Sequence, residues 1–189
     1  PVKGMLACGW EGEGKLQDPA IIMEEAVRAL TRQDLAGERV LVTAGPTLEE
    51  IDPVRFISNH SSGKMGYAIA RAARRRGAEV VLVSGPTCLD DPWGIETVRV
   101  CSAVEMRDAV LERVAASTII VKAAAVADYR PRSRAAGKIK KTAAALVLEL
   151  EKNPDILAEV GGVKGDRVLV GFAAETGELV ENARKKLTG

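Results

Sequence analysis

The sequence predicts an α/β fold, namely a Rossmann-like open, mostly parallel sheet with helices on both faces. Two observations predict it. Short runs of Val, Leu and Ile alternate with longer segments of helical periodicity, which is the pattern of β-α-β units. Ala and Val also dominate the apolar residues, which suits helices packed closely on buried parallel strands.

The expected elements follow a glycine-rich stretch at 1–18, and a polar linker at 31–38 separates the first helix from the rest. In chain order, the expected helices lie at 19–30, 63–76, 103–116, 155–160 and 178–187. The expected strands lie at 40–43, 80–84, 97–101, 118–125, 146–150 and 167–172.

Two of these segments indicate which of their faces is covered. The inner face of the helix at 63–76 is expected to carry Met65, Ile69, Ala72 and Ala73. At 146–150, Leu alternates with Val and Glu, so the strand presents one apolar face that another surface must cover.

The composition excludes several classes of protein. The 189 residues carry 27 Lys and Arg against 26 Asp and Glu, so a net charge of +1 argues against a nucleic-acid partner. Three cysteines and one histidine lack metal-ligand spacing, and free thiols suit a reducing compartment. Apolar runs are too short to cross a membrane, so we expect a cytoplasmic protein. Because the chain starts at Pro1, we also expect it to be part of a longer protein.

The loop at 57–66 precedes a predicted helix and carries small hydroxyl residues and glycines. Such a helix start exposes backbone N–H groups, and the helix dipole favours an anion such as phosphate. The spacing fits neither a Walker loop nor a complete GxGxxG motif, because Met65 follows Lys64 and Ser61 replaces the first glycine. The alternative is a helix start in which Ser and Asn only satisfy backbone groups.

Further candidate residues follow the later strands, where ligands of open α/β sheets bind. Asp128 follows three alanines and could hold Mg²⁺ or contact a base or ribose, or it could cap a turn. The basic segment 130–141 could be a mobile flap over phosphate groups, or a solvated loop. Phe172 could pack on a nucleobase or in the core.

These residues lie within motifs that resemble the bacterial phosphopantothenate–cysteine ligase family of coenzyme A biosynthesis. The resemblance runs in order from about residue 38 to the end of the chain. Its motifs are VTAGPTLEEIDPVRFISNHSSGKMG (42–66), AAAVADYRP (123–131), KIKK (138–141), KNPDI (152–156) and VGFAAET (170–176). The earlier segment LACGWEGEGKLQDP (6–19) is similar to the tail of the flavin-dependent phosphopantothenoylcysteine decarboxylase, which bacteria commonly fuse ahead of the ligase.

The resemblance implies a two-step reaction. The carboxylate of 4′-phosphopantothenate attacks the α-phosphate of CTP, which gives an acyl-cytidylate and pyrophosphate. The amine of cysteine then displaces CMP. The implied cofactor is Mg²⁺, FMN would belong only to the absent decarboxylase part, and a homodimer is implied, with the region around 146–150 at its interface.

The resemblance also implies roles for single residues. Asn59 and Lys138 would be catalytic, with Asn59 at the acyl phosphate and Lys138 neutralising phosphate charge. The CTP site would consist of Ala123, Ala124, Asp128, Lys138, Asn153, Pro154, Asp155, Ile156, Phe172 and Lys186, with Asp128 also a possible Mg²⁺ ligand. Phosphate or substrate would bind Ser61, Ser62, Gly63 and Gly66. Cys8 would correspond to the proton donor of the decarboxylase.

We therefore expect 1–36 to be the decarboxylase remnant with its linker, and 37–189 to be a ligase domain lacking its C-terminal part. Two alternatives are a dinucleotide-binding oxidoreductase and a non-catalytic interaction module. The oxidoreductase is disfavoured because the strand at 80–84 ends in Ser84 and Gly85 without the usual acidic ribose partner.

Overall fold

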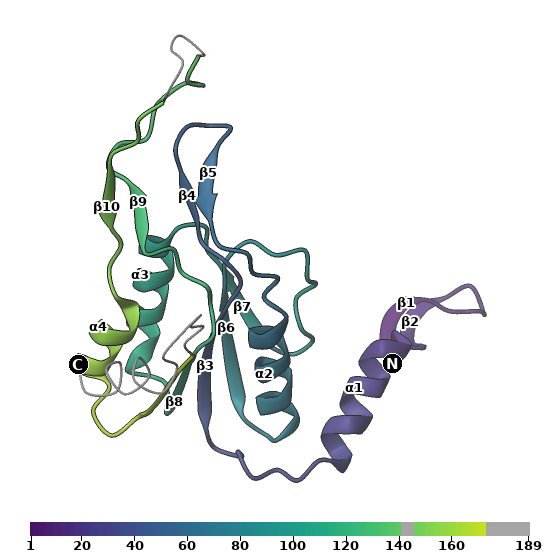
Figure 1. Cartoon of the computed structure of the whole chain (residues 1–189). Helices are drawn as coiled ribbons and strands as arrows, with labels where there is room; N and C mark the ends of the chain where they lie inside the picture. The colour runs from purple at the N-terminus through teal and green to yellow at the C-terminus, as the bar shows by residue number, and fades with distance from the viewer. Residues whose placement is uncertain (141–145, 173–189) are drawn as a thin grey trace.

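A five-stranded parallel sheet forms the centre of the molecule (Figure 1). The computed structural model describes residues 1–140 and 146–172. In the order in which they lie side by side, the strands are β11 (Val168–Gly171), β8 (Ile119–Lys122), β3 (Arg39–Ala44), β6 (Glu79–Ser84) and β7 (Glu96–Arg99). The predicted fold class is therefore confirmed.

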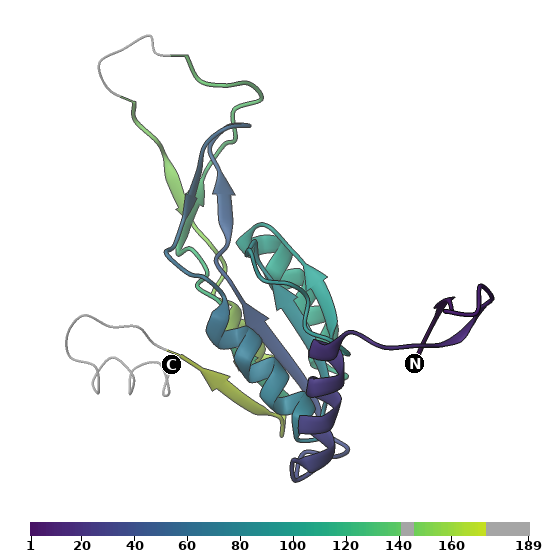
Figure 2. The same cartoon turned by 90° about the vertical axis from the view of Figure 1, so that its right-hand side faces the viewer.

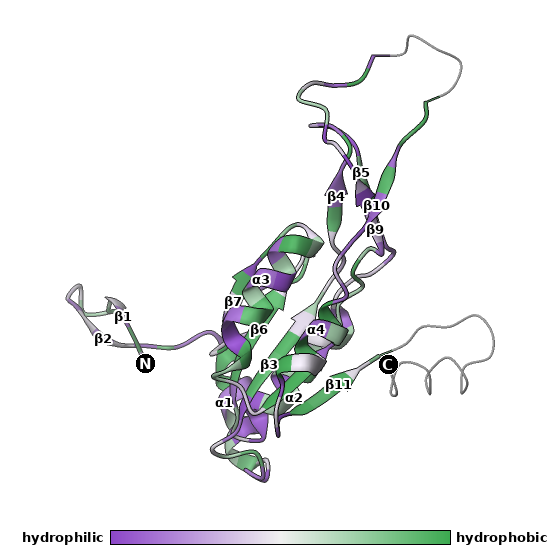
Figure 3. Ribbon diagram, turned by 90° about the vertical axis from the view of Figure 1, so that its left-hand side faces the viewer, coloured by the Kyte–Doolittle hydropathy of each residue, from purple (hydrophilic) through white to green (hydrophobic). Residues whose placement is uncertain are grey.

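Helices cover both faces of this sheet. They are α2 (Lys64–Arg75) on one face, and α3 (Ala103–Val114) and α4 (Ile156–Val163) on the other, while α1 (Pro19–Leu30) lies against α2. Successive residues of β3 point to opposite faces. Val40 and Val42 lie in one core with residues of α2, and Leu41 lies in the other core with residues of α3 and α4. The buried strands and helix faces are correspondingly apolar in Figure 3.

The order of the strands creates one special position in the sheet. The chain runs from β3 outward through β6 to β7, and then returns to β8 on the other side of β3. The connections that follow β3 and β8 therefore diverge, which makes the carboxyl ends of these two strands the switch point of the sheet. Ligands of open α/β sheets bind at such a switch point.

Two short antiparallel pairs project from this end of the sheet and form what we call the arm (48–58, 129–140 and 146–152; Figures 1 and 2). One pair is β4 (Leu48–Glu50) with β5 (Phe56–Ser58), and the other is β9 (Tyr129–Pro131) with β10 (Leu150–Lys152). β4 lies beside β9. The basic segment that follows β9 thus lies beside the hairpin that β4 and β5 form.

The strand expected at 146–150 is wrong in its position. β10 begins at Leu150 and pairs with β9. Leu146, Val147 and Leu148 precede it without regular structure, and their side chains are exposed. The alternation of Leu was therefore a misleading signal, because a strand needs a partner strand for its backbone groups, and β9 is only three residues long.

The expected inner face of α2 is also partly wrong. Met65 and Ala72 are exposed, whereas Tyr67 and Ala70 are buried. The reason is Gly66, at which an added Cβ would lie 2.5 Å from the Cβ of Ala44. The lack of a side chain lets the helix backbone approach β3, so the smallest residue of the helix sets the buried face.

The first 36 residues form two parts. A hairpin of β1 (Val2–Met5) and β2 (Glu11–Lys15), which the glycine-rich stretch did not indicate, stands away from the sheet (Figure 2). The expected helix at 19–30 is confirmed as α1, and it lies beside α2. The expected linker at 31–38 is tethered rather than free, because the backbone N–H of Leu35 donates to the carbonyl of Arg76.

The helix expected at 178–187 lies outside the described residues. Among the residues that are described, none of the helices is long and apolar enough to cross a membrane.

Candidate functional site

Backbone and hydroxyl groups join the loops that follow β3 and β8. The Thr43 hydroxyl accepts a hydrogen bond from the N–H of Ala124 at 3.1 Å, and the Thr47 hydroxyl accepts one from Ala127 at 3.0 Å. The N–H of Ala125 donates to the carbonyl of Gly45 at 2.9 Å. The predicted site residues Ala123 and Ala124 therefore lie at the switch point, and their small side chains leave the backbone accessible to a flat ligand.

Asn59 reaches this junction from the loop after β5. Its Nδ2 donates to the carbonyls of Ala125 and Val126, at 3.3 and 3.0 Å. Asn59 is exposed, and its hydrogen bonds go to the loop after β8 and not to the start of α2. The structure thus brings Asn59 together with the alanines, as expected for residues of one site.

The start of α2 faces the same junction and keeps its backbone amides available. Gly63 is the N-cap, has φ 75°, and contributes no side-chain cap. A Cβ on Gly63 would lie 2.7 Å from Cγ2 of Thr87, so only glycine fits this left-handed position. The Ser61 hydroxyl accepts from the N–H of Gly63 at 3.4 Å, and Ser62 is exposed. This geometry favours the anion-binding interpretation over the capped helix start.

Asp128 and Asn153 meet beside the switch point. The N–H of Asn153 donates to the carbonyl of Asp128 at 2.8 Å, and its Nδ2 donates to the carbonyl of Ala127 at 2.8 Å. The Asp128 side chain is exposed and makes no hydrogen bond or ion pair within 1–140 and 146–172. It does not cap a turn, so its carboxylate is available to a ligand.

The residues after Asn153 have structural roles of their own. Asp155 is the N-cap of α4, and its Oδ1 accepts from the N–H groups of Leu157 and Ala158 at 3.0 and 3.1 Å. The Ile156 side chain is buried in the core, so only its backbone could face a ligand. Pro154 joins these two residues to Asn153 and brings them to the same edge of the sheet.

Phe172 directly follows β11, and 52 % of its surface is exposed. This exposure contradicts the alternative in which Phe172 packs in the core, and it leaves the ring free to stack on a ligand. Lys186, the remaining predicted CTP contact, lies outside the described residues.

Lys138 is not brought to the switch point by the contacts of its neighbours. The residue after it, Ile139, binds the turn between β4 and β5, where its N–H donates to Oδ2 of Asp52 at 3.1 Å and its carbonyl accepts from Arg55 at 2.7 Å. The basic segment is thus pinned to the arm and is not the free loop that its composition indicates.

Asp52 is the residue at this turn that the sequence reasoning did not single out. Burial would raise the pKa of its carboxyl, but hydrogen bonds from the N–H groups of Ile139, Val54 and Arg55, together with the Arg55 charge, lower it to about 2. A possible sequence signal was the Asp-Pro-Val-Arg turn at 52–55, which places an acid and a base three residues apart.

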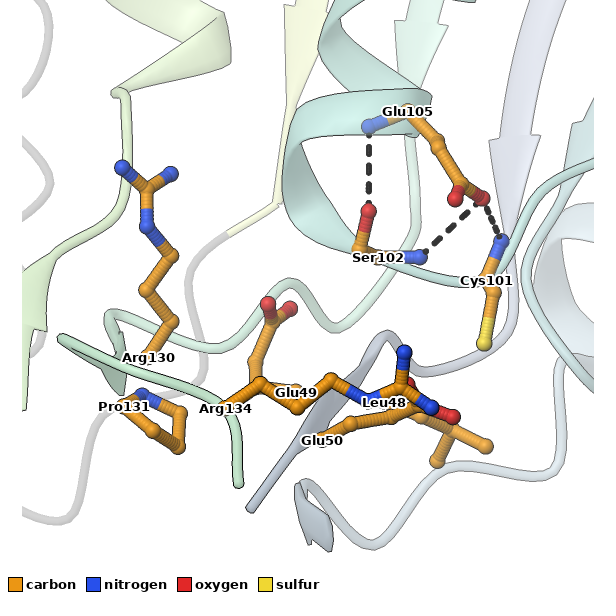
Figure 4. A pocket seen from close by; sticks show the side chains of 9 residues that line it. All are labelled: Leu48, Glu49, Glu50, Cys101, Ser102, Glu105, Arg130, Pro131 and Arg134. Carbon is orange, nitrogen blue, oxygen red and sulfur yellow. Dashed lines mark hydrogen bonds and ion pairs between the residues drawn. The ribbon is translucent and has the colours of Figure 1, made fainter. Parts of the chain in front are cut away.

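A cavity of about 320 Å³ lies between the arm and the start of α3 (Figure 4). Its polar side chains already have protein partners: Glu105 accepts from the N–H of Cys101 at 2.7 Å, and Glu49 accepts from the N–H of Ala103 at 2.9 Å. Burial, with the charges of Glu105 and its neighbours, raises the pKa of the Cys101 thiol. These groups are therefore structural, and this thiol is poorly suited to act as a nucleophile.

No cluster of three or more acidic, cysteine or histidine side chains that could hold a metal occurs within the described part of the chain. Asp128 could contribute one ligand to a hard cation, which takes most of its oxygens from phosphate and water in nucleotide sites. Cys8 is exposed and lies in the turn between β1 and β2, the hairpin that stands away from the sheet in Figure 2.

The strand order, the glycine-mediated contact of α2 with β3 and the open helix start define a Rossmann-like α/β domain with a candidate ligand site at the switch point. The model of a family described as the DNA/pantothenate metabolism flavoprotein C-terminal domain matches residues 35–189. The chain belongs to this family.

Curated relatives agree with this assignment. The chain is 49 % identical to the coenzyme A biosynthesis bifunctional protein CoaBC of Bacillus subtilis, over 99 % of this chain and 47 % of that protein. Identity to the Escherichia coli protein of the same name is also 49 %, over 98 % of this chain and 47 % of that protein. The chain thus spans about half the length of these relatives.

Solved structures share the fold. The C-terminal domain of a CoaBC protein aligns with a TM-score of 0.73 and 50 % identity, over 82 % of this chain and 74 % of that chain. A flavoprotein of the same family name from Streptococcus pneumoniae aligns with a TM-score of 0.71 and 28 % identity, over 80 % and 78 %. A Cab2 variant in complex with phosphopantothenate-cysteine, with a TM-score of 0.68 over 91 % and 77 %, is 18 % identical, which is a likeness of fold alone.

Proposed function

We propose that this chain ligates cysteine to 4′-phosphopantothenate at the expense of CTP, as a step of coenzyme A biosynthesis. The observation that carries the proposal is the convergence of Asn59, the alanines after β8 and the open start of α2 at one switch point. The naming of its relatives as coenzyme A biosynthesis proteins supports the same reaction.

The first step joins two anions. A carboxylate oxygen of phosphopantothenate forms a bond to the α-phosphorus of CTP while the bond to pyrophosphate breaks. The amides at the start of α2, near Gly63 and Gly66, would bind phosphate oxygens and offset their charge. Mg²⁺ bound to the triphosphate would add charge stabilisation, and Asp128 is the side chain placed to reach it or the ribose.

The second step forms the amide. The cysteine amine attacks the acyl carbon of the acyl-cytidylate, loses a proton, and CMP leaves with the bonding electrons. Asn59 is held beside the switch point by its bonds to the carbonyls of Ala125 and Val126. From that position its amide would contact the acyl phosphate and orient the acyl carbon.

The remaining parts of the proposal concern architecture and partners. Residues 1–36 would be the tail of a flavin-dependent decarboxylase and 37–189 the ligase domain. The word bifunctional in the names of the relatives supports this division, and FMN would then belong to the decarboxylase. A homodimer is supported by exposed apolar side chains on the arm, which are Val54, Phe56, Tyr129, Leu146, Val147, Leu148 and Leu150.

The test is pyrophosphate release from CTP and Mg²⁺. We expect release that depends on 4′-phosphopantothenate, a condensation product detected by mass spectrometry once cysteine is added, and weaker release with ATP. We also expect CTP to raise the melting temperature more than ATP, NAD or FMN does. A shift with NAD alone would favour the oxidoreductase, and no nucleotide binding would favour an interaction module.

A further inference from the structure

We propose that Asp52 is a positioning residue that fixes the place of Lys138 by holding the backbone of Ile139. The inference rests on the proposed function, in which Lys138 would neutralise phosphate charge as the family resemblance implies, and it adds the residue that positions this lysine. It is argued from the contacts between the β4–β5 turn and the basic segment.

The Asp52 carboxylate has two ends with different partners. Oδ1 accepts from the N–H groups of Val54 and Arg55 at 2.8 and 2.9 Å, which builds the turn itself. Oδ2 accepts from the N–H of Ile139 at 3.1 Å and pairs with Nη2 of Arg55 at 2.8 Å. The side chain is fully buried, so water does not compete for these bonds. One oxygen shapes the turn and the other holds a segment 87 residues away.

Arg55 binds the second backbone group of Ile139, its carbonyl. Its Nη2 also donates to the carbonyl of Ile139 at 2.7 Å. Both backbone groups of Ile139 are therefore bonded to the turn, one to an acid and one to a base. Because Lys138 is joined to Ile139 by the peptide bond whose N–H is held, the position of its Cα is fixed as well.

Charge explains why such a hold is needed. Arg55, Lys138 and Lys140 line one cavity of about 510 Å³ with Val54 and Ile139. Three like charges around one space repel each other. Asp52 offsets one of them and ties the backbone between the two lysines. The segment makes two other contacts with the same hairpin, Ala135 with Ile51 and Arg134 with Glu50. Both lie several residues before Lys138, so on their own they would not fix its position.

The substitution Asp52→Asn separates the two functions of the carboxylate. The amide oxygen of Asn can still accept from Val54 and Arg55 and keep the turn. The amide nitrogen would face the N–H of Ile139 and the guanidinium of Arg55, which are all donors. Asp52→Ser is a second variant, because its hydroxyl can also support the turn but is too short to reach Ile139. Asp166→Asn, on an exposed aspartate far along the chain, is the control.

The first measurement is independent of activity. Trypsin cuts after Lys138, at the peptide bond whose N–H donates to Asp52. We expect both Asp52 variants to cleave at this bond at least about fivefold faster than the parent and the control, by mass spectrometry, at a temperature well below the melting temperature of every variant. Equal cleavage rates would overturn the hold itself, whatever reaction the protein catalyses.

The second measurement uses pyrophosphate release from CTP. We expect Asp52→Asn to lower kcat/KM for CTP about tenfold, as for a lost charge-assisted contact, and to add little further loss when combined with Lys138→Ala. Additive losses would show that Asp52 does not act through Lys138. If the Asp52 variants are cleaved faster but the parent releases no pyrophosphate, the contact between Asp52 and Ile139 stands and the proposed function is refuted.

Discussion

At the scale of single residues, Asn59 carries the sharpest chemical assignment. We expect Asn59→Ala to bind CTP with nearly the affinity of the parent, because its contacts in the structure are to Ala125 and Val126 and not to the start of α2. Turnover should fall about 100-fold, the loss typical for one oriented donor. Calorimetry with CTP and single-turnover product formation measure the two effects.

Unchanged turnover of Asn59→Ala would contradict the catalytic role of Asn59. If the variant turned over as fast as the parent, Asn59 would only join the two loops. His60→Ala is the matched control, since His60 is the exposed neighbour of Asn59 in the same loop.

Asp52 adds a prediction about pH at the same scale. Its pKa is about 2 in the folded protein, below the ordinary value of 3.8. Because the folded pKa is depressed, the stabilisation is fully present above about pH 4 and is lost as pH falls toward 2. We expect the free energy of unfolding of Asp52→Asn to depend less steeply on pH than that of the parent between these values. Urea unfolding at several pH values tests this, and parallel curves would refute it.

At the scale of elements, the packing of α2 on β3 depends on a position that has no side chain, Gly66. A Cβ on Gly66 would lie 2.5 Å from the Cβ of Ala44 and 2.8 Å from the carbonyl oxygen of Thr43. We expect Gly66→Ala to lower the free energy of unfolding by about 1–3 kcal/mol, because α2 must move away from the sheet. Gly161→Ala in α4 is the control, since an added Cβ there meets nothing within 4 Å. Equal stability of the two variants would contradict the close approach.

The docking of α1 on α2 is electrostatic. Arg75 pairs with Glu24 at 2.6 Å and Arg74 pairs with Glu25, while α1 has no buried residue. In the linker that follows α1, Asp34 pairs with Arg76 at 2.7 Å. Hydrogen bonds from these arginines lower the pKa values of all three carboxyl groups. The helix is therefore held by charge and not by an apolar core.

We expect the double substitution Glu24→Gln with Glu25→Gln to speed trypsin cleavage after Arg28, and high salt to do the same to the parent. The melting temperature should change little, because exposed ion pairs contribute only about 0.2–1 kcal/mol each. Glu11→Gln with Glu13→Gln, in the hairpin, is the control. Cleavage rates that ignore both the substitutions and salt would show that charge does not hold α1.

The elements also show what the sequence could predict. β3 and β6 each contain a continuous run of Val and Leu, at 40–42 and 80–83, so their strand character is local and was predictable. The arm was not, because β4, β5, β9 and β10 have three residues each and depend on remote partners. In the site, the loop leading into α2 has a local signal in its glycines. The contact between Asp52 and Ile139 has no such local signal, because it joins residues far apart in the chain.

At the scale of the whole molecule, the order of the strands in the sheet brings the candidate site residues together. The chain reverses its direction of winding between β3 and β8, and the loops after these strands bring Asn59, the alanines at 123–125 and the start of α2 to one place. The arm extends from the same edge and carries the basic segment (Figure 1). The fold thus explains how residues from distant motifs come to lie together, as the proposed nucleotide site requires.

The central claim is that CTP binds at this switch point, and a crystal structure of the chain with CTP and Mg²⁺ tests it most directly. We predict the triphosphate over the backbone amides near Gly63 and Gly66, with the nucleoside against Ala123 and Ala124 and within reach of Asp128. A nucleotide bound instead in the cavity beside α3, or on the edge strand β7, would contradict it.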